Sequence, residues 1–182
     1  LGAVEIVRRR VEQYAIDCDL RWGYCDLANK PGDYQGFRED MEELQALGYR
    51  HEMRLVPAAE MRSVVGSDRY VGGLLDKSGG HIHPLNLALG EAEAIRMQGG
   101  RIFEQSAVTS ITPGQPALVK TAKGAVKARF VVVAGNAYLG NLVPELASKS
   151  MPCGTQVIAT EVLGEERARS LLPQNYCLED SN

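Results

Sequence analysis

The fold expected of this chain is decided by one stretch, Phe130-Val131-Val132-Val133-Ala134-Gly135-Asn136-Ala137-Tyr138-Leu139-Gly140. Its first four residues carry no charge and three are β-branched, which is typical of a strand buried on both faces of a parallel sheet. Gly135 follows, and because glycine has no Cβ, the backbone there can turn sharply or approach a ligand closely. Open α/β sheets bind cofactors where such strands end. The stretch therefore predicts an α/β protein with a cofactor near this turn.

The glycine-rich loop that usually accompanies such a site is missing. A dinucleotide fold normally carries G-x-G-x-x-G between its first strand and first helix, yet no two glycines of this chain are separated by a single residue. The chain also starts almost at once in an amphipathic pattern and ends at Glu179-Asp180-Ser181-Asn182 with no expected closing element. We therefore expect the central part of a larger enzyme.

Composition describes an ordinary globular protein. The chain has 182 residues, 45% of them hydrophobic, and a formal net charge of -3, so it can bury a core and offers no electrostatic reason to bind nucleic acid. Arg8, Arg9 and Arg10 fall in a helical pattern, where successive side chains point about 100° apart, which favours solvated positions over one basic patch. No apolar stretch reaches the roughly 18 to 20 residues that span a membrane, and no signal peptide is present.

Cysteine usage bears on the compartment. The four cysteines, Cys18, Cys25, Cys153 and Cys177, form neither a C-x-x-C pair nor a dense disulfide framework. Proteins of reducing compartments keep such thiols free. The sequence thus predicts packing thiols and a cytoplasmic location.

The spacing of apolar residues and the positions of glycine and proline predict a mixture of helices and strands. Helices are expected over Val4–Tyr14 and Phe37–Leu47, from Pro57 to Val64, from Pro84 to the Gly99-Gly100 stop, and over Glu165–Leu171. Extended segments are expected over Cys18–Ala28, Tyr49–Val56, Tyr70–Leu75 (closed by Ser78-Gly79-Gly80), Ile102–Ile111, a hairpin over Leu118–Phe130 that turns at Lys123-Gly124, and Thr155–Val162. The fold class is accordingly α/β, with α and β parts mixed.

Three segments together resemble a known family. They are Gly79-Gly80-His81-Ile82-His83-Pro84 with the alanine-rich helix after it, the extended residues from Phe103 to Ile111, and Phe130 to Gly140. Their order and spacing resemble the middle of the FAD-dependent amino-acid and amine oxidases of the D-amino-acid oxidase superfamily. The resemblance implies part of a Rossmann-type FAD domain over residues 1–17 and 79–150, and part of an antiparallel substrate sheet over residues 18–78 and 151–182.

Longer runs resemble one functional branch of that family. Gly80 to Ala92, Val133 to Pro144 and Met151 to Glu161 look like the members that degrade polyamines through gamma-glutamylputrescine. The resemblance implies that FAD oxidises the carbon bearing a primary amine, that the imine hydrolyses to an aldehyde and ammonia, and that oxygen is reduced to hydrogen peroxide. Its partners are then a small amine and molecular oxygen. Surfaces that the absent segments would cover also predict a homo-oligomer.

The resemblance also assigns residues to the cofactor. Val108 matches the position whose backbone faces the adenine of FAD, and Ala134, Gly135 and Asn136 match the turn near its ribose and pyrophosphate. The family's N-terminal glycine unit, its acidic ribose ligand and its C-terminal flavin-contacting region have no counterpart in this sequence, so independent FAD binding is not implied.

Several side chains carry two readings each. His81 and His83 would share one face of an extended segment, as two metal ligands can, but no third or fourth ligand is identifiable. We therefore favour a role as helix cap for one of the two imidazoles. His81 is the candidate for a place beside the active site. Asn136 and Tyr138 suit either flavin phosphates or ordinary turn chemistry.

The aromatic and acidic residues near the first expected strand also fit two roles each. Trp22 and Tyr24 suit an amine channel or a core, and Asp17, Asp19 and Asp26 suit a cationic amine or a structural role. Two other functions remain for the whole chain: a non-catalytic α/β interaction module, and an α/β enzyme that uses another nucleotide.

Overall fold

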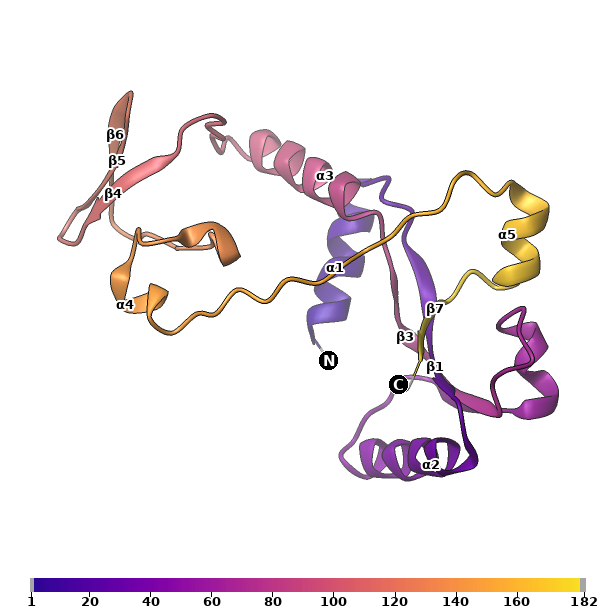
Figure 1. The fold of residues 1–182 in the computed structure, drawn as a ribbon. Helices are drawn as coiled ribbons and strands as arrows, with labels where there is room; N and C mark the ends of the chain where they lie inside the picture. Colours follow the sequence, from indigo (N-terminus) through magenta and orange to yellow (C-terminus); the bar gives the residue numbers. More distant parts are fainter. Residues whose placement is uncertain (1, 181–182) are drawn as a thin grey trace. The chain divides into compact units, whose positions relative to one another are not determined.

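The computed structural model describes residues 2–180, so Leu1, Ser181 and Asn182 of the expected domains lie outside the described residues. The described residues divide into two compact units, 2–100 with 160–180, and 101–159. Each unit mixes helices and strands, which confirms the expected fold class (Figure 1). The assignment of residues to cofactor and substrate domains stays a prediction.

The first unit is built on a mixed four-stranded sheet in the order β2-β3-β1-β7. β1 pairs antiparallel with β3 and parallel with β7, and β2 pairs antiparallel with β3. The strands of this sheet are β1 (Arg21–Ala28), β2 (Met53–Pro57), β3 (Gly72–His81) and β7 (Cys177–Asp180). The helices of the unit are α1 (Gly2–Gln13), α2 (Pro31–Ala46), the 3₁₀ turn η1 (Ala58–Ser63), α3 (Pro84–Met97) and α5 (Glu165–Leu171).

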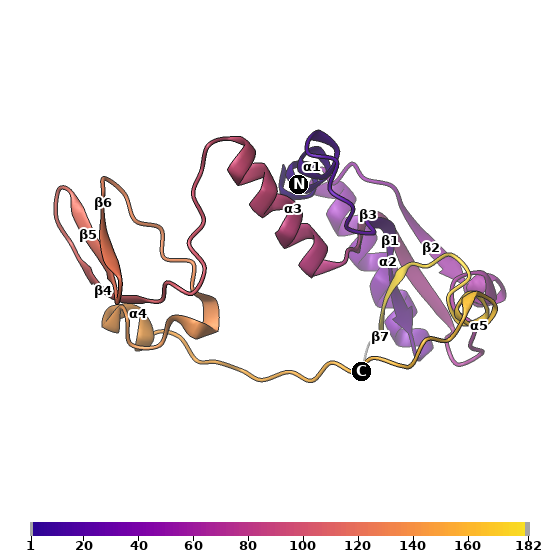
Figure 2. The same cartoon turned by 90° about the horizontal axis from the view of Figure 1, so that it is seen from above.

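The second unit contains a three-stranded antiparallel sheet in the order β4-β5-β6 and two short helical segments (Figure 2). Val119 of β5 pairs with Ile111 on one side and Val126 on the other. The tight turn after Thr121 confirms the hairpin that Lys123-Gly124 predicts. The elements are β4 (Val108–Thr112), β5 (Ala117–Thr121), β6 (Gly124–Ala128), η2 (Asn136–Leu139) and α4 (Pro144–Ala147).

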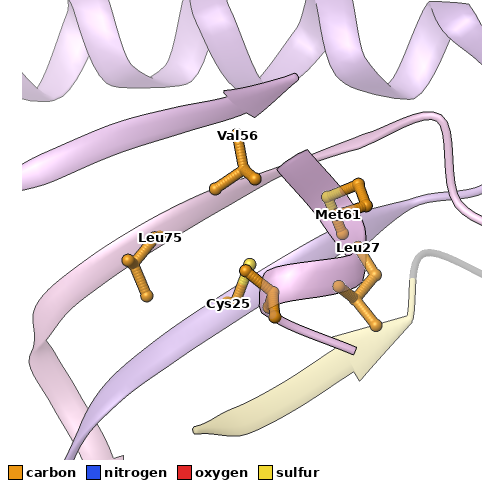
Figure 3. Close-up of a cluster of buried hydrophobic side chains, with 6 residues drawn as sticks. Cys25, Leu27, Val56, Met61 and Leu75 are labelled. Atoms are coloured by element: carbon orange, nitrogen blue, oxygen red, sulfur yellow. The ribbon is translucent and has the colours of Figure 1, made fainter. Parts of the chain in front are cut away.

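The core lies on one face of the four-stranded sheet. Because strand side chains alternate between faces, Cys25 and Leu27 of β1 point to the same side, where they meet Leu75 of β3. Met61 and Val64, three residues apart around η1, cover them, and Met61 is only 1% exposed. Figure 3 shows these side chains converging between the strands and η1.

Local signals explain most helix boundaries. Pro31 occupies the first turn of α2, where a missing N–H is harmless, and the Asp33 carboxylate accepts the backbone N–H of Lys30 at 3.2 Å. The sequence predicts a turn at Asn29-Lys30-Pro31-Gly32, but the helix already begins at Pro31. Gly48, with φ of 85°, follows the helix in the left-handed conformation expected of a stop.

β3 extends beyond its expected end. Ser78-Gly79-Gly80, expected as a closing turn, continues the strand to His81, since Gly80 and His81 pair with Trp22 and Arg21 of β1 beyond an irregularity in the register. The glycines allow a close approach: a Cβ on Gly79 would lie 2.6 Å from the Cβ of Tyr24, and one on Gly80 would overlap the carbonyl oxygen of Arg21. The glycine pair is thus a packing requirement of the sheet.

Two expected strands do not form. Residues 130–133 and 155–162 have no strand structure, and Phe130, Val132, Val157 and Ile158 are each more than 80% exposed. A strand needs a neighbour for its backbone hydrogen bonds, and among the described residues neither segment has one. Conversely, Cys177–Asp180, expected to be irregular, pairs with β1 as β7.

The sequence predicts that one face of α3, made of Leu85, Ala88, Leu89, Ala92 and Ile95, is the packed one, but the helix packs through a different stripe. Leu85 and Leu89 are each 60% exposed, whereas Ala94 is buried and Gly90 lies against Ile16. A Cβ on Gly90 would overlap the side chain of Ile16, so the small residues set the close approach of the helix. Arg10 of α1 donates to Glu91 of α3 at 3.0 Å and joins the two helices.

Candidate functional site

The expected cofactor turn lies in the second unit, at the start of η2. Asn136 has a φ of 47°, the left-handed conformation that asparagine tolerates better than most residues. Its Oδ1 accepts a hydrogen bond from the N–H of Ala137 at 2.8 Å. The Asn136 side chain therefore stabilises its own turn, which is one of the two roles expected for it. Tyr138 is 96% exposed and projects into solvent.

Gly135 is not required by the conformation of its own turn. Its φ of -80° is open to any residue, and a Cβ there would lie 3.4 Å from the nearest atoms of Leu139, an ordinary contact. The absent side chain instead leaves the backbone of residues 134–136 uncovered. This small-residue backbone fits the close approach of an extended polar group such as a dinucleotide.

A hollow of about 490 Å³ adjoins the turn within the same unit. Its wall combines amide side chains with the sulfur-bearing segment 151–153, and it is lined by Asn136, Ala137, Leu139, Gly140, Asn141, Ala147, Ser150, Met151, Pro152 and Cys153. The lining is mixed: Asn136, Asn141 and Ser150 are polar, whereas Leu139, Met151 and Pro152 are apolar. Gly135 and Ala134 precede this wall in the chain.

Val108, the other expected cofactor residue, begins the edge strand β4. It pairs with Thr121 of β5 and is 37% exposed, and the register shifts between Val108 and Ser110. Since β4 is the outer strand of its sheet, the opposite edge of its backbone has no strand partner among residues 2–180. An unpaired edge can offer peptide N–H and C=O groups to a base. Val108 and the turn at residues 134–136 thus both fit FAD, the cofactor that the resemblance implies.

His81 ends β3 in the first unit, so it belongs to a different unit from Val108 and the turn. Its Nε2 lies 2.9 Å from the carbonyl oxygen of Asn175. A carbonyl oxygen only accepts, so Nε2 carries the hydrogen and Nδ1 carries a lone pair unless the ring is protonated. The structure gives His81 a structural contact, and its expected place beside the active site stays a prediction.

His83 caps a helix, as one of the expected readings holds. Its Nδ1 accepts a hydrogen bond from the N–H of Asn86 at 3.2 Å at the start of α3. Within residues 2–180, no group of three or more His, Cys, Asp or Glu side chains could hold a metal ion. Neither is any helix of that part of the chain long and apolar enough to cross a membrane.

The aromatic residues of β1 have structural partners. The guanidinium of Arg8 lies 4.2 Å from the ring centre of Trp22, which joins α1 to the sheet. Tyr24 lies over Gly79. These contacts support the packing interpretation of both residues.

A polar cluster on β3 was not expected from the sequence. The Tyr49 hydroxyl donates to Asp76, and the Ser78 hydroxyl lies 2.5 Å from the Tyr49 oxygen. Burial, followed by the Asp76 hydrogen bond, raises the pKa of Tyr49. Burial, with the charges of Asp40 and Asp76, raises the pKa of Asp26. The one available signal was a carboxylate directly after the buried pair Leu74-Leu75.

The comparisons with known proteins identify the family. The model of the FAD dependent oxidoreductase (DAO) family matches residues 1–181. Gamma-glutamylputrescine oxidoreductase of Escherichia coli is 56% identical over 98% of this chain and 42% of its own length. A probable oxidoreductase, OrdL, of Haemophilus influenzae is 36% identical over 100% of this chain and 43% of its own length.

Solved structures show the same fold. L-proline dehydrogenase from P. horikoshii matches with a TM-score of 0.68 at 21% identity, covering 81% of this chain and 40% of that one. Glycine oxidase from Geobacillus kaustophilus matches with a TM-score of 0.65 at 18% identity, covering 78% of this chain and 39% of that one. The chain spans about two fifths of the length of these relatives. It belongs to the family of FAD-dependent oxidoreductases.

Proposed function

We propose that the protein oxidises the primary amine of gamma-glutamylputrescine to an aldehyde, releasing ammonia and hydrogen peroxide. The observation that carries this proposal is the 56% identity to the Escherichia coli gamma-glutamylputrescine oxidoreductase across 98% of the chain. The solved structures similar to this chain include proteins titled L-proline dehydrogenase and glycine oxidase, at 18 to 21% identity. Their likeness supports the fold and leaves the choice of amine to the closer relative.

The chemistry divides between cofactor and protein. When bound, FAD would supply the two-electron oxidation of the amine, with molecular oxygen as the proposed electron acceptor. Water then adds to the imine carbon and the C–N bond breaks, which gives the aldehyde and ammonia. The protein binds the cofactor, orients the amine and limits the access of water.

In this scheme the chain's own residues hold the cofactor and face the substrate. The uncovered backbone of Ala134, Gly135 and Asn136 would hold the ribose and pyrophosphate of FAD, and Val108 would hold its adenine. His81 keeps its Nε2–H on the Asn175 carbonyl, which leaves the Nδ1 lone pair able to accept a hydrogen bond from the amine. These roles support binding and orientation.

Product analysis on the complete gene product that carries this chain tests the proposed reaction. Purified protein is incubated with gamma-glutamylputrescine, and hydrogen peroxide and ammonia are quantified against aldehyde, with putrescine, glycine and L-proline as parallel substrates. We expect equal amounts of the three products from gamma-glutamylputrescine and little turnover of the others. Turnover of glycine or L-proline alone would overturn the substrate, and aldehyde without hydrogen peroxide would overturn oxygen as the acceptor.

A glycine substitution tests the cofactor turn separately. Gly135→Ala leaves the fold undisturbed because its Cβ would make only an ordinary contact with Leu139, so we expect an unchanged melting temperature with FAD affinity reduced about tenfold or more. Gly154→Ala is the matched control, since a Cβ there meets nothing within 4 Å. Equal FAD affinity in both variants would remove Gly135 from the cofactor site.

The same proposal extends to location and partners. All four cysteines are free in the structure, as is usual in a reducing compartment, which supports a cytoplasmic location. The apolar segments around Val132 and Ile158 are largely exposed, which supports association with further polypeptide, another copy of the protein included. Sedimentation velocity of the complete gene product would measure that association directly.

A further inference from the structure

The strand β7 is tied to the rest of the first unit by separate contacts at its beginning and its end. It pairs with β1 over four residues, from Tyr24 opposite Cys177 to Leu27 opposite Asp180. None of the four residues of β7 is buried, whereas β1 buries half of its eight residues. Detaching β7 therefore uncovers far less apolar surface than detaching β1 would.

The contacts at the beginning come from His81 and Gly23. The His81 imidazole holds the carbonyl of Asn175, whose φ of 54° turns the chain into the strand. The next residue, Tyr176, places its ring directly over Gly23. Gly23 has a φ of 119° and lies at an irregularity of β1, and a Cβ there would overlap the Tyr176 ring.

The contacts at the end come from a carboxylate. Asp180 accepts from the side-chain amide of Asn29 at 2.5 Å and from the Tyr70 hydroxyl at 3.1 Å. Arg69 in turn donates to the amide oxygen of Asn29 at 2.8 Å, which fixes its orientation. Upstream, the N–H of Gly66 donates to the carbonyl of Leu171 at 2.8 Å and anchors α5 independently.

We propose that residues 175–180 form a latched strap: β7 opens from β1 as a unit while β1, β2 and β3 stay folded, and the contact of Tyr176 with Gly23 sets how often it opens. Among residues 2–180, β7 is the outer strand of its sheet, and short, weakly buried outer strands are those that open below the global unfolding free energy. Opening exposes the edge of β1 from Tyr24 to Leu27 and releases the His81 imidazole from Asn175.

Hydrogen exchange of the complete gene product tests the opening without any substitution. We expect the amides of residues 177–180 to exchange at least about tenfold faster than the protected amides of residues 73–76 in β3, and to respond less steeply to low concentrations of urea. Equal rates and equal urea dependence in the two segments would mean that β7 leaves only with global unfolding, which overturns the strap.

A matched glycine pair tests the latch. Gly23→Ala and Gly48→Ala both place a Cβ at positive φ, but only the first collides with a neighbour, since nothing lies within 4 Å of Gly48. We expect Gly23→Ala to speed exchange of residues 177–180 about tenfold or more over Gly48→Ala, with β3 amides unchanged.

Tyr176→Ala and His81→Ala probe the same contacts from the partner side, and they keep the test decisive if Gly23→Ala fails to fold. Tyr176→Ala should speed exchange of residues 177–180 alone. His81→Gln, which keeps an N–H donor, should restore the slow exchange that His81→Ala loses. A Tyr176→Ala variant with unchanged exchange would overturn the latch.

Discussion

Tyr49 and Asp76 are joined across β2 and β3 by a hydrogen bond from the phenol to the carboxylate, and the other carboxylate oxygen accepts the N–H of Ser78 at 2.7 Å. The pair fixes the segment before β2 onto the middle of β3. Replacing Tyr49 by phenylalanine leaves one acceptor of a partly buried carboxylate without its donor. We expect Tyr49→Phe to lower the free energy of unfolding in urea by about 1 kcal/mol.

Tyr138→Phe is the control for that experiment. Tyr138 is 96% exposed, so its hydroxyl is free to exchange with water and its removal should change stability by less than about 0.5 kcal/mol. Equal losses in the two variants would show that the phenol of Tyr49 contributes nothing specific.

Alkaline pH should destabilise the protein through groups that hold their protons more tightly when folded. Burial raises the pKa of Cys25 from 9.0 to about 12, and burial with the Asp76 bond raises the pKa of Tyr49 above its ordinary 10.0. Burial, followed by the hydrogen bond to Asp180, also raises the pKa of Tyr70. Because the folded state then binds more protons, stability is complete below pH 9.0 and falls as pH rises towards 12 and beyond.

Urea titrations at a series of alkaline pH values measure this loss. Tyr49→Phe removes one titrating group, so its stability should fall less steeply above pH 10.0 than that of the unmodified protein. An identical slope in the two proteins would exclude Tyr49 from the alkaline transition.

The core under η1 should be sensitive to cavity formation. Met61 is 1% exposed and lies among Cys25, Leu27 and Val56, so Met61→Ala should lower the free energy of unfolding by about 2 to 5 kcal/mol. Met97→Ala makes the same chemical change at a side chain that is 71% exposed, and we expect less than about 0.5 kcal/mol. Chemical denaturation of both variants is the measurement, and similar losses would place the core elsewhere.

The stacking of Arg8 on Trp22 can be followed by fluorescence because the chain has a single tryptophan. Arg8→Ala removes the cation above the ring and admits water, so the emission should shift to longer wavelength and stability should fall by about 0.5 to 1 kcal/mol. Arg9→Ala, one residue along α1, is the control and should leave the emission unchanged. A shift of equal size in the control would indicate loss of α1 rather than of the stacking.

Local patterns were sufficient where the partners of an element lie close in sequence. The apolar stripe of α1, the span of α5 and the β5–β6 hairpin were all predictable, since turn residues and helix periodicity act within a few positions. The strands that the sequence predicts around Val132 and Ile158 do not form, because a strand exists only where another segment accepts its hydrogen bonds. The same nonlocality explains β7, whose partner Tyr24 lies at the other end of the chain.

The same distinction between local and distant partners applies to the candidate site. The sequence predicts that one of His81 and His83 caps the following helix, and the structure shows that His83 does so. The contact of His81 with Asn175 and the cluster of Tyr49, Asp76 and Ser78 join distant segments, so no local pattern reports them. The cofactor roles of Val108 and Gly135 came from family resemblance and stay predictions.

The packing of the Tyr176 ring on Gly23 couples the substitutions that these two distant positions can accept. A bulkier residue at position 23 can be accommodated only if the ring at position 176 becomes smaller, and a smaller residue at 176 leaves a gap that a side chain at 23 could fill. Among relatives, these two positions should therefore change together or not at all.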